Sequence, residues 1–115
     1  MTRGLAAFLD AVLVLAFAVA GRRSHAEGVD VPGILRTAWP FLAGAAAGWA
    51  LASLMVDADP RSLSFGAVVV VCAVALGMVL RRVTGQGTAP SFVLVATVVL
   101  SVLLLGWRLV ARLAP

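Results

Sequence analysis

One acidic side chain lies inside an otherwise apolar stretch of the sequence. Asp10 follows Arg3 by seven residues and stands within the run from Gly4 to Gly21. At the standard helical rise its carboxyl lies roughly 10 Å along a helix from Arg3. If this run crosses a membrane, the acid needs a cationic or polar partner, and such groups often serve proton or cation coupling. Asp10 is therefore the first candidate for chemistry.

Arg108 is the partner that we expect for Asp10, because it enters the last apolar run from the same side of a membrane. Two interpretations of this pair stay open. The carboxyl is either a titratable site for coupling, or a structural group paired with Arg108 or bonded to a Ser or Thr, which fixes helix packing.

Arginine pairs stand at two corresponding places, since Arg22-Arg23 recurs as Arg81-Arg82 fifty-nine positions later. Arginine binds phosphate in a forked geometry that lysine cannot match, and the starts of the helices that follow also favour anions. We expect a face that binds an anion or a lipid headgroup, with plain headgroup anchoring as the alternative. The candidate residues are Arg22, Arg23, Ser24, His25, Arg81, Arg82, Thr84 and Thr88.

The composition indicates an integral membrane protein. Of the 115 residues, 63% are hydrophobic and 12% are charged, against roughly a quarter charged in a typical soluble domain. So few charges cannot cover the surface of a small soluble domain. The net charge of +4 comes from arginines beside apolar runs, without interleaved aromatics, which argues against nucleic-acid binding. We expect a multi-pass protein of the cell membrane whose partners are lipids, anionic lipids included.

No combination of side chains in the sequence is typical of an enzyme or a metal site. His25 is the single histidine and Cys72 the single cysteine, and neither belongs to a cluster with metal-ligand spacing. A catalytic triad, a phosphate loop and a carboxylate pair are also missing. We therefore expect no enzymatic activity, no cofactor and no bound metal.

Four apolar runs supply the elements that must position these residues. About 20 residues cross a hydrocarbon core of roughly 30 Å, and in lipid a helix satisfies its own backbone groups while an open sheet edge cannot. The sequence predicts an all-α integral membrane protein with one transmembrane domain over residues 1–115. The expected helices cover about 4–21, 37–56 with a helical lead-in from 31, 63–80 and 90–113.

The first run has a second interpretation. Arg3, the apolar stretch and Ala18-Val19-Ala20 resemble a secretory signal with a cleavage site. The ionisable Asp10 and the arginine pair after that site argue against cleavage, so we expect a retained helix.

Three features recur in the same order in the two halves of the chain. Besides the arginine pairs, Asp30-Val31-Pro32 recurs as Thr88-Ala89-Pro90, and Gly48-Trp49-x-Leu51 recurs as Gly106-Trp107-x-Leu109, each fifty-eight positions later. In the first of these motifs Asp30 is a helix cap followed by proline. The pattern predicts two tandem helical hairpins related by a pseudo-twofold axis along the membrane normal.

This arrangement places both arginine pairs on one side, the arginine-loop face. That face holds five arginines, and the opposite face holds four arginines and the amino terminus, so the charge rule leaves the orientation open. Trp39, Trp49 and Trp107 are expected as anchors at the membrane interfaces.

Small residues predict close contacts between helices. Gly44 and Gly48 form one small-residue motif, Ala73 and Gly77 a second, and Thr97 and Ser101 form a polar pair on the last span. We expect seams within one chain, with a homodimer face as the alternative. Four thin helices leave little room for a pore, so transport would require a dimer.

The runs GRRSHAEG, TAWPFLAG and LRRVTGQGTAPSF resemble an uncharacterised family of small four-helix prokaryotic membrane proteins, classed as a domain of unknown function. The resemblance covers nearly the whole chain and implies four membrane helices without an established activity. The small multidrug transporters are similar only in length, helix number and an acid in the first helix.

Two function hypotheses follow. The first is a dimeric transporter or channel-like protein with Asp10 as its intramembrane titratable site. The second is a non-transporting membrane scaffold or accessory subunit that binds anionic lipid or a partner membrane protein.

Overall fold

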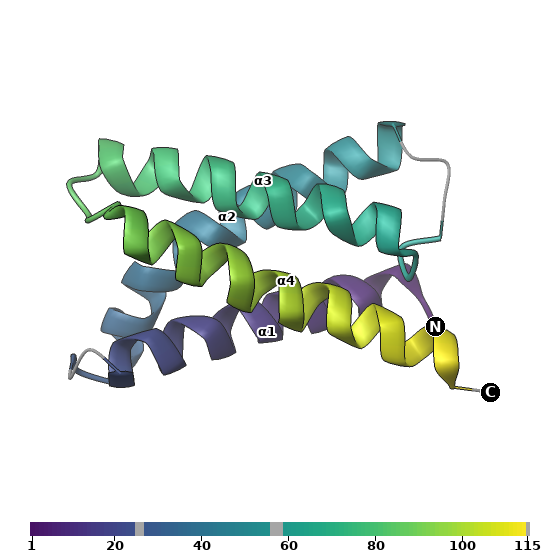
Figure 1. The fold of residues 1–115 in the computed structure, drawn as a ribbon, viewed down its shortest axis with the longest axis horizontal. Coiled ribbons are helices and arrows are strands. Elements are labelled where there is room, and N and C mark those ends of the chain that lie inside the picture. The colour runs from purple at the N-terminus through teal and green to yellow at the C-terminus, as the bar shows by residue number, and fades with distance from the viewer. Residues whose placement is uncertain (25–26, 56–58, 115) are drawn as a thin grey trace.

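Four α-helices form the fold of the computed structural model, which describes residues 1–24, 27–55 and 59–114. Each helix is long and apolar enough to cross a membrane, which confirms the predicted all-α membrane class. The described residues contain no strand. The helices are α1 (Arg3–Ser24), α2 (Val31–Met55), α3 (Leu63–Val83) and α4 (Pro90–Leu113), as Figure 1 shows.

Two helices extend beyond their expected ends and include the arginine pairs. α1 ends at Ser24 and α3 at Val83, so both pairs lie in the last turn of their helices. The carbonyl groups and the dipole at a helix C-terminus favour such cations. The arginine pairs thus belong to the ends of α1 and α3, at the same end of the bundle as the starts of α2 and α4 (Figure 1).

The starts of α2 and α4 follow from their first residues. Asp30 caps α2, because its Oδ1 accepts a hydrogen bond of 3.0 Å from the Gly33 N–H. Pro90 occupies the first turn of α4, where a missing backbone donor does no harm. The expected end of the second span, Val56, lies outside the described residues.

The helices surround a common axis in chain order. Each helix packs on its neighbours in sequence, and α4 closes the ring against α1, while α1–α3 and α2–α4 are diagonal pairs. Both termini lie at one end of the bundle, together with the α2–α3 connection (Figure 1). The α1–α2 and α3–α4 loops lie at the other end, so side chains at the two ends belong to different sites.

The closest helix pair is α2 with α3, and the predicted small residues form its seam. A Cβ atom on Gly44 would lie 2.7 Å from the Cys72 carbonyl oxygen and 2.8 Å from the Ala73 Cα. A Cβ on Gly77 would meet the Phe41 ring at 2.7 Å. Gly48 has the same role against Val69, where the distance to the Cα is 2.8 Å. Glycine is therefore required where these two backbones approach.

The threonine of the expected polar pair on α4 forms its hydrogen bond within its own helix. The Thr97 hydroxyl donates to the Val93 carbonyl on its own helix at 2.7 Å, and the residue is exposed. Such a bond satisfies the hydroxyl without a partner helix.

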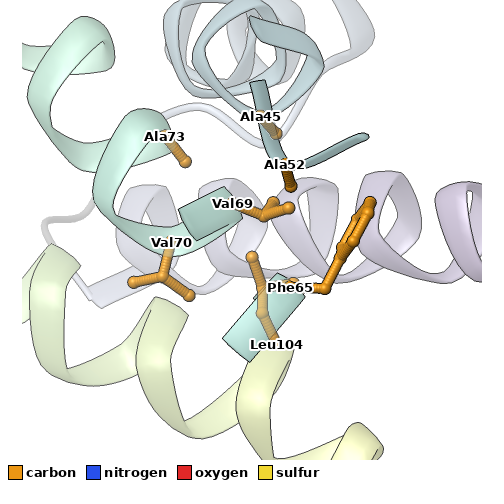
Figure 2. Close-up of a cluster of buried hydrophobic side chains, with 7 residues drawn as sticks. All are labelled: Ala45, Ala52, Phe65, Val69, Val70, Ala73 and Leu104. Carbon is orange, nitrogen blue, oxygen red and sulfur yellow. The ribbon is translucent and has the colours of Figure 1, made fainter. Parts of the chain in front are cut away.

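Apolar side chains fill the bundle between its two ends. Figure 2 shows one cluster, in which Phe65, Val69 and Val70 of α3 pack with residues of α2 and Leu104 of α4. A second cluster contains Phe17 of α1, Phe41, and the α4 residues Ala96 and Leu100. The charged side chains are therefore confined to the two ends of the bundle.

Candidate functional site

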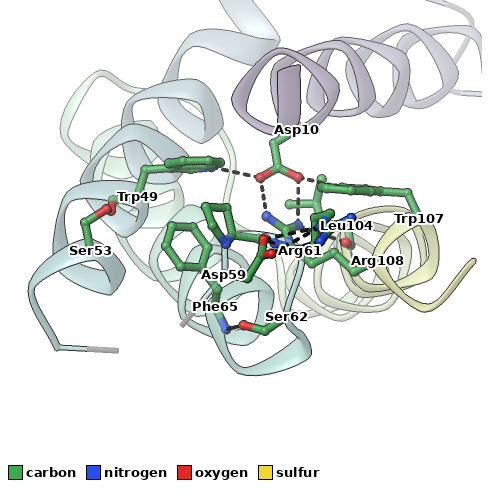
Figure 3. Close-up of polar contacts among 11 residues, drawn as sticks. Asp10, Trp49, Ser53, Asp59, Arg61, Ser62, Phe65, Leu104, Trp107 and Arg108 are labelled. Carbon is green, nitrogen blue, oxygen red and sulfur yellow. Dashed lines mark hydrogen bonds and ion pairs between the residues drawn. The ribbon is translucent and has the colours of Figure 1, made fainter. Parts of the chain in front are cut away.

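Asp10 and Arg108 form a forked ion pair near the end of the bundle that holds the termini. Arg108 Nη1 donates to Asp10 Oδ1 at 2.8 Å, and Nη2 donates to Oδ2 at 2.7 Å (Figure 3). The two residues are 1% and 0% exposed. The structure thus joins the two residues that the sequence pairs, in the planar geometry that suits guanidinium and carboxylate.

Two tryptophans complete the surroundings of the carboxylate. The Trp49 indole N–H donates to Asp10 Oδ2, and the Trp107 N–H donates to Oδ1, both at 2.8 Å. Figure 3 shows the two rings reaching Asp10 from opposite sides. Both N–H groups thus point into the bundle and bond to Asp10, a contact that their expected role as interfacial anchors does not include. Trp39 is exposed, as an anchor would be.

Arg108 also bonds to the backbone on two elements. Its Nε donates to the Pro60 carbonyl at 2.9 Å, and its Nη1 donates to the Leu104 carbonyl at 3.0 Å. We call the group Asp10, Trp49, Trp107 and Arg108 the Asp10 clamp. Because these contacts connect α1, α2, α4 and the turn before α3, the clamp closes this end of the bundle.

Neighbouring residues make room for the clamp and cover it. A Cβ on Gly66 would lie 2.6 Å from Arg108 Cδ, so only glycine leaves space for the arginine stem. The Phe65 ring packs on Trp49 edge to face, with centroids 4.7 Å apart. Arg3 lies over the Trp49 ring at 5.5 Å and donates to Ser53 Oγ at 2.7 Å. No pattern of residues indicated Gly66 or Ser53, because their roles depend on the rotation of each helix about its axis.

The chemistry of the clamp is that of a buried ion pair with matched partners. Each Asp10 oxygen accepts one bond from Arg108 and one from an indole. Replacing one partner by a neutral residue would leave the other charge buried without a counter-ion, which is strongly unfavourable. The arrangement therefore holds helices together.

A cavity of about 800 Å³ opens at the arginine-loop face, at the other end of the bundle. Three arginines line it, Arg22 of α1, Arg36 of α2 and Arg81 of α3. Phe17 and Phe92 contribute aromatic rings to its wall. The cavity therefore combines guanidinium groups with apolar surface.

Arg22 and Arg81 make matching contacts in their own loops. Each Nε donates to the carbonyl of the glycine six positions later, Gly28 or Gly87. Arg22 Nη1 donates to Thr37 Oγ1 at 3.1 Å, and Arg81 Nη1 donates to Gln86 Oε1 at 3.0 Å. Each arginine thus organises the loop that follows its helix.

The two arginines differ in their ionic partners. Arg22 Nη1 lies 3.2 Å from Glu27 Oε2, whereas the acceptors of Arg81 among the described residues are neutral. The Arg81 guanidinium lies 4.4 Å from the Phe92 ring centroid. Arg81 is therefore oriented by its neighbours, and no ion pair joins it to a carboxylate among the described residues.

Only part of the predicted arginine-loop set lies at the cavity. Arg22 and Arg81 line it, whereas Arg23, Arg82 and Thr88 do not. The hydroxyls of Ser24 and Thr84 donate to carbonyls at the ends of α1 and α3. His25 lies outside the described residues.

Several cavity residues were missed by the sequence interpretation. Arg36, Gln86, Glu27 and Asp30 all line the cavity. The Gln86 amide also donates to the Arg36 carbonyl at 3.2 Å, which joins the α3–α4 loop to α2. The only signal in the sequence was the closeness of these residues to the arginine pairs.

Comparisons with known proteins place the chain in a family. No curated protein and no solved structure matches it. A family model described as a protein of unknown function (DUF3054) matches residues 7–111. That range includes the Asp10 clamp and the lining of the cavity, and it confirms the resemblance to an uncharacterised family. The chain is a small multi-pass membrane protein and belongs to this family of unknown function.

Proposed function

We propose that this protein binds a phosphate-bearing lipid headgroup in the cavity at the arginine-loop face and acts as a non-transporting membrane scaffold or accessory subunit. The observation that carries the proposal is the position of Arg81, which lies at the cavity and stacks on Phe92 without a carboxylate partner among the described residues.

Arg81 has hydrogen-bonding capacity to spare. Its described bonds use Nε and Nη1, and none of them uses Nη2. A guanidinium carries more N–H donors than these two bonds occupy, and phosphate oxygens match its forked geometry. A phosphate that approaches from the cavity would therefore find a cation already held in place.

The size and depth of the cavity also suit a headgroup. Its volume of about 800 Å³ falls within the range of about 300–1,000 Å³ typical of small-molecule sites. It lies among the last turns of α1 and α3 and the first turns of α2 and α4. Helix ends lie at the level of the headgroups when a helix spans the hydrocarbon core.

Native mass spectrometry tests this function. The protein is extracted from vesicles that contain phosphatidylethanolamine and phosphatidylglycerol, and the total bound phospholipid is counted. We expect Arg81→Gln to weaken retention on the order of tenfold, because a charged hydrogen bond contributes about 1.5–3 kcal/mol. Arg82→Gln is the matched control, since Arg82 is adjacent but does not line the cavity. Equal retention by wild type and Arg81→Gln would reject the site.

Transport is the second candidate function, in the form of a dimeric transporter or channel-like protein with Asp10 as its titratable site. The observation that favours it is the difference between a closed clamp end and an open cavity end, as in one state of a carrier that alternates between two. Proteoliposomes with a pH gradient and an internal pH dye test it. Faster decay with wild type than with Asp10→Asn supports transport, and decay no faster than in protein-free vesicles opposes it.

We also infer that the two hairpins are copies of one unit related by a pseudo-twofold axis. The support comes from the paired contacts Arg22–Gly28 and Arg81–Gly87, and from the indole bonds of Trp49 and Trp107 to one carboxylate. A chimera in which the sequence of residues 81–88 replaces residues 22–30 should keep the far-UV circular dichroism of the wild type. Loss of the helical fold would contradict the repeat.

A further inference from the structure

We propose, on the basis of the headgroup site above, that the cavity selects a phosphate ester that also carries a primary ammonium group. Phosphatidylethanolamine has this chemistry, whereas phosphatidylglycerol carries only the anionic charge. The inference comes from the unequal charges of the two loops that border the cavity.

The α3–α4 side of the cavity is cationic. Arg81 and Gln86 line this side, and Arg81 Nη1 donates a hydrogen bond to Gln86 Oε1. The Arg81 guanidinium is held over Phe92 at 4.4 Å. This side offers N–H donors and a positive charge, which suits a phosphate.

The α1–α2 side of the cavity carries charges of both signs, since Arg22 and Arg36 line it together with Glu27 and Asp30. Glu27 is within 3.2 Å of Arg22, so its charge is largely balanced by that arginine. Asp30 Oδ1 and Arg22 Nη2 each lie 2.5 Å from the position that a Cβ on Gly33 would take, so this guanidinium is also near Asp30. Asp30 Oδ1 accepts the N–H of Gly33, and the described bonds of Asp30 do not use Oδ2, so the carboxylate keeps acceptor capacity toward the cavity that Arg81 lines.

The Asp30 carboxylate on one side and the Arg81 guanidinium on the other discriminate between headgroups. A headgroup with phosphate alone would place a second anion near Asp30, which is unfavourable. A primary ammonium group has N–H donors for the carboxylate, whereas the quaternary ammonium of phosphatidylcholine has none. The Gln86–Arg36 hydrogen bond of 3.2 Å joins the α3–α4 loop to α2. Because Arg81 and Asp30 line the same cavity, both charges act on one bound headgroup.

The test compares three lipids with identical acyl chains. Wild-type protein is equilibrated with vesicles of equimolar phosphatidylethanolamine, phosphatidylglycerol and phosphatidylcholine, and the bound lipids are identified by native mass spectrometry. We expect phosphatidylethanolamine to be enriched several-fold. Asp30→Asn should remove its advantage over phosphatidylglycerol, because asparagine caps a helix as well as aspartate but carries no charge. Asp59→Asn, on the opposite face, should change nothing.

The outcomes separate this inference from the headgroup site itself. Enrichment of phosphatidylglycerol or phosphatidylcholine by the wild type, or an unchanged lipid preference in Asp30→Asn, overturns the ammonium inference. The headgroup site itself still stands in that case if Arg81→Gln reduces the total bound lipid. Full retention of lipid by Arg81→Gln overturns the site. Soluble phosphoethanolamine, added to lipid-free protein in detergent, shows whether the ligand is a lipid or a free phosphate ester. If it binds as tightly as phosphatidylethanolamine, the natural ligand need not be a lipid and the proposal of a lipid ligand is contradicted.

Discussion

The two ends of the bundle use arginine in opposite ways. At the clamp end, Arg108 bonds to Asp10 and to two backbone carbonyls. At the cavity end, Arg81 bonds to neutral acceptors of its own loop and lies at an open cavity. The residue type is the same, but the protein supplies the counter-ion and acceptors of the Arg108 guanidinium, whereas the Arg81 guanidinium keeps N–H donors for an external partner.

Burial explains the difference. Arg108 is 0% exposed, so the protein itself must supply its counter-ion and acceptors. Arg81 is partly exposed, and water or a headgroup can reach it. An arginine that the fold surrounds stabilises structure, whereas one at a cavity can bind a ligand. The predictions below test this division, from the largest expected effect to the smallest.

Breaking the clamp should have the largest effect on stability. Asp10→Asn leaves the buried Arg108 without its counter-ion, and we expect the free energy of unfolding to fall by about 3–5 kcal/mol. The measurement is unfolding in mixed micelles of increasing dodecyl sulfate content, followed by circular dichroism. Glu27→Gln breaks an ion pair with an exposed carboxylate at the other end, where a loss of about 0–1 kcal/mol is typical. Equal losses would contradict the division between the two ends.

The double variant Asp10→Asn, Arg108→Gln refines this result. Removing both charges leaves no uncompensated ion, so its loss should be smaller than the sum of the two single losses. Additive losses would show that the two side chains act independently.

Substitution of the two clamp tryptophans should have the second-largest effect on stability. Trp49→Phe and Trp107→Phe each remove one 2.8 Å hydrogen bond to the Asp10 carboxylate, and we expect each to lower the free energy of unfolding by about 1.5–3 kcal/mol. Trp39→Phe is the control, because Trp39 is exposed. If all three substitutions have the same effect, the indoles of Trp49 and Trp107 act as anchors after all.

The sequence predicted the helices and the clamp's ion pair for a physical reason. Uncharged runs of the length of a bilayer must be helices, and an acid at the depth of Asp10 needs a cation at a similar depth, which Arg108 supplies. The bonds of Trp49 and Trp107 to Asp10 were not predicted, because a residue's depth in the membrane does not determine which way its side chain faces around the helix. That direction depends on packing, which the α2–α3 seam at Gly44 and Gly48 sets.

The cavity was harder to predict than the clamp. The repeated arginine pairs indicated the face at which the cavity opens, but of the seven predicted residues that the structure describes only Arg22 and Arg81 line the cavity. Successive residues on a helix point about 100° apart, so one arginine of each pair faces the cavity and the next faces away. Glu27 and Asp30 reach the same space through the path of their loop, which no periodicity encodes.

Removing Arg81 should have a much smaller effect on stability than removing Arg108. Its acceptors, the Gly87 carbonyl and the Gln86 amide, belong to a loop at the cavity where water can replace the guanidinium. We expect Arg81→Gln to lower the free energy of unfolding by about 1 kcal/mol or less, and Arg108→Gln to lower it several times more. The same dodecyl sulfate titration measures both. A loss for Arg81→Gln as large as that for Arg108→Gln would assign Arg81 a structural role.

The smallest effect should come from an exposed ion pair at the clamp end. Asp59 accepts hydrogen bonds from the Arg61 side chain, with Nη2 and Oδ2 3.0 Å apart, and these bonds lower the pKa of the Asp59 carboxyl below its ordinary value of 3.8. The pair's contribution to the stability of the fold is therefore complete above pH 3.8, and it disappears as the pH falls through the lowered pKa of Asp59. In Arg61→Gln, NMR titration should show the pKa of Asp59 rising toward 3.8, with no measurable change in unfolding at neutral pH. A large loss of stability there would mean that position at this end of the bundle, rather than burial, makes an ion pair strong.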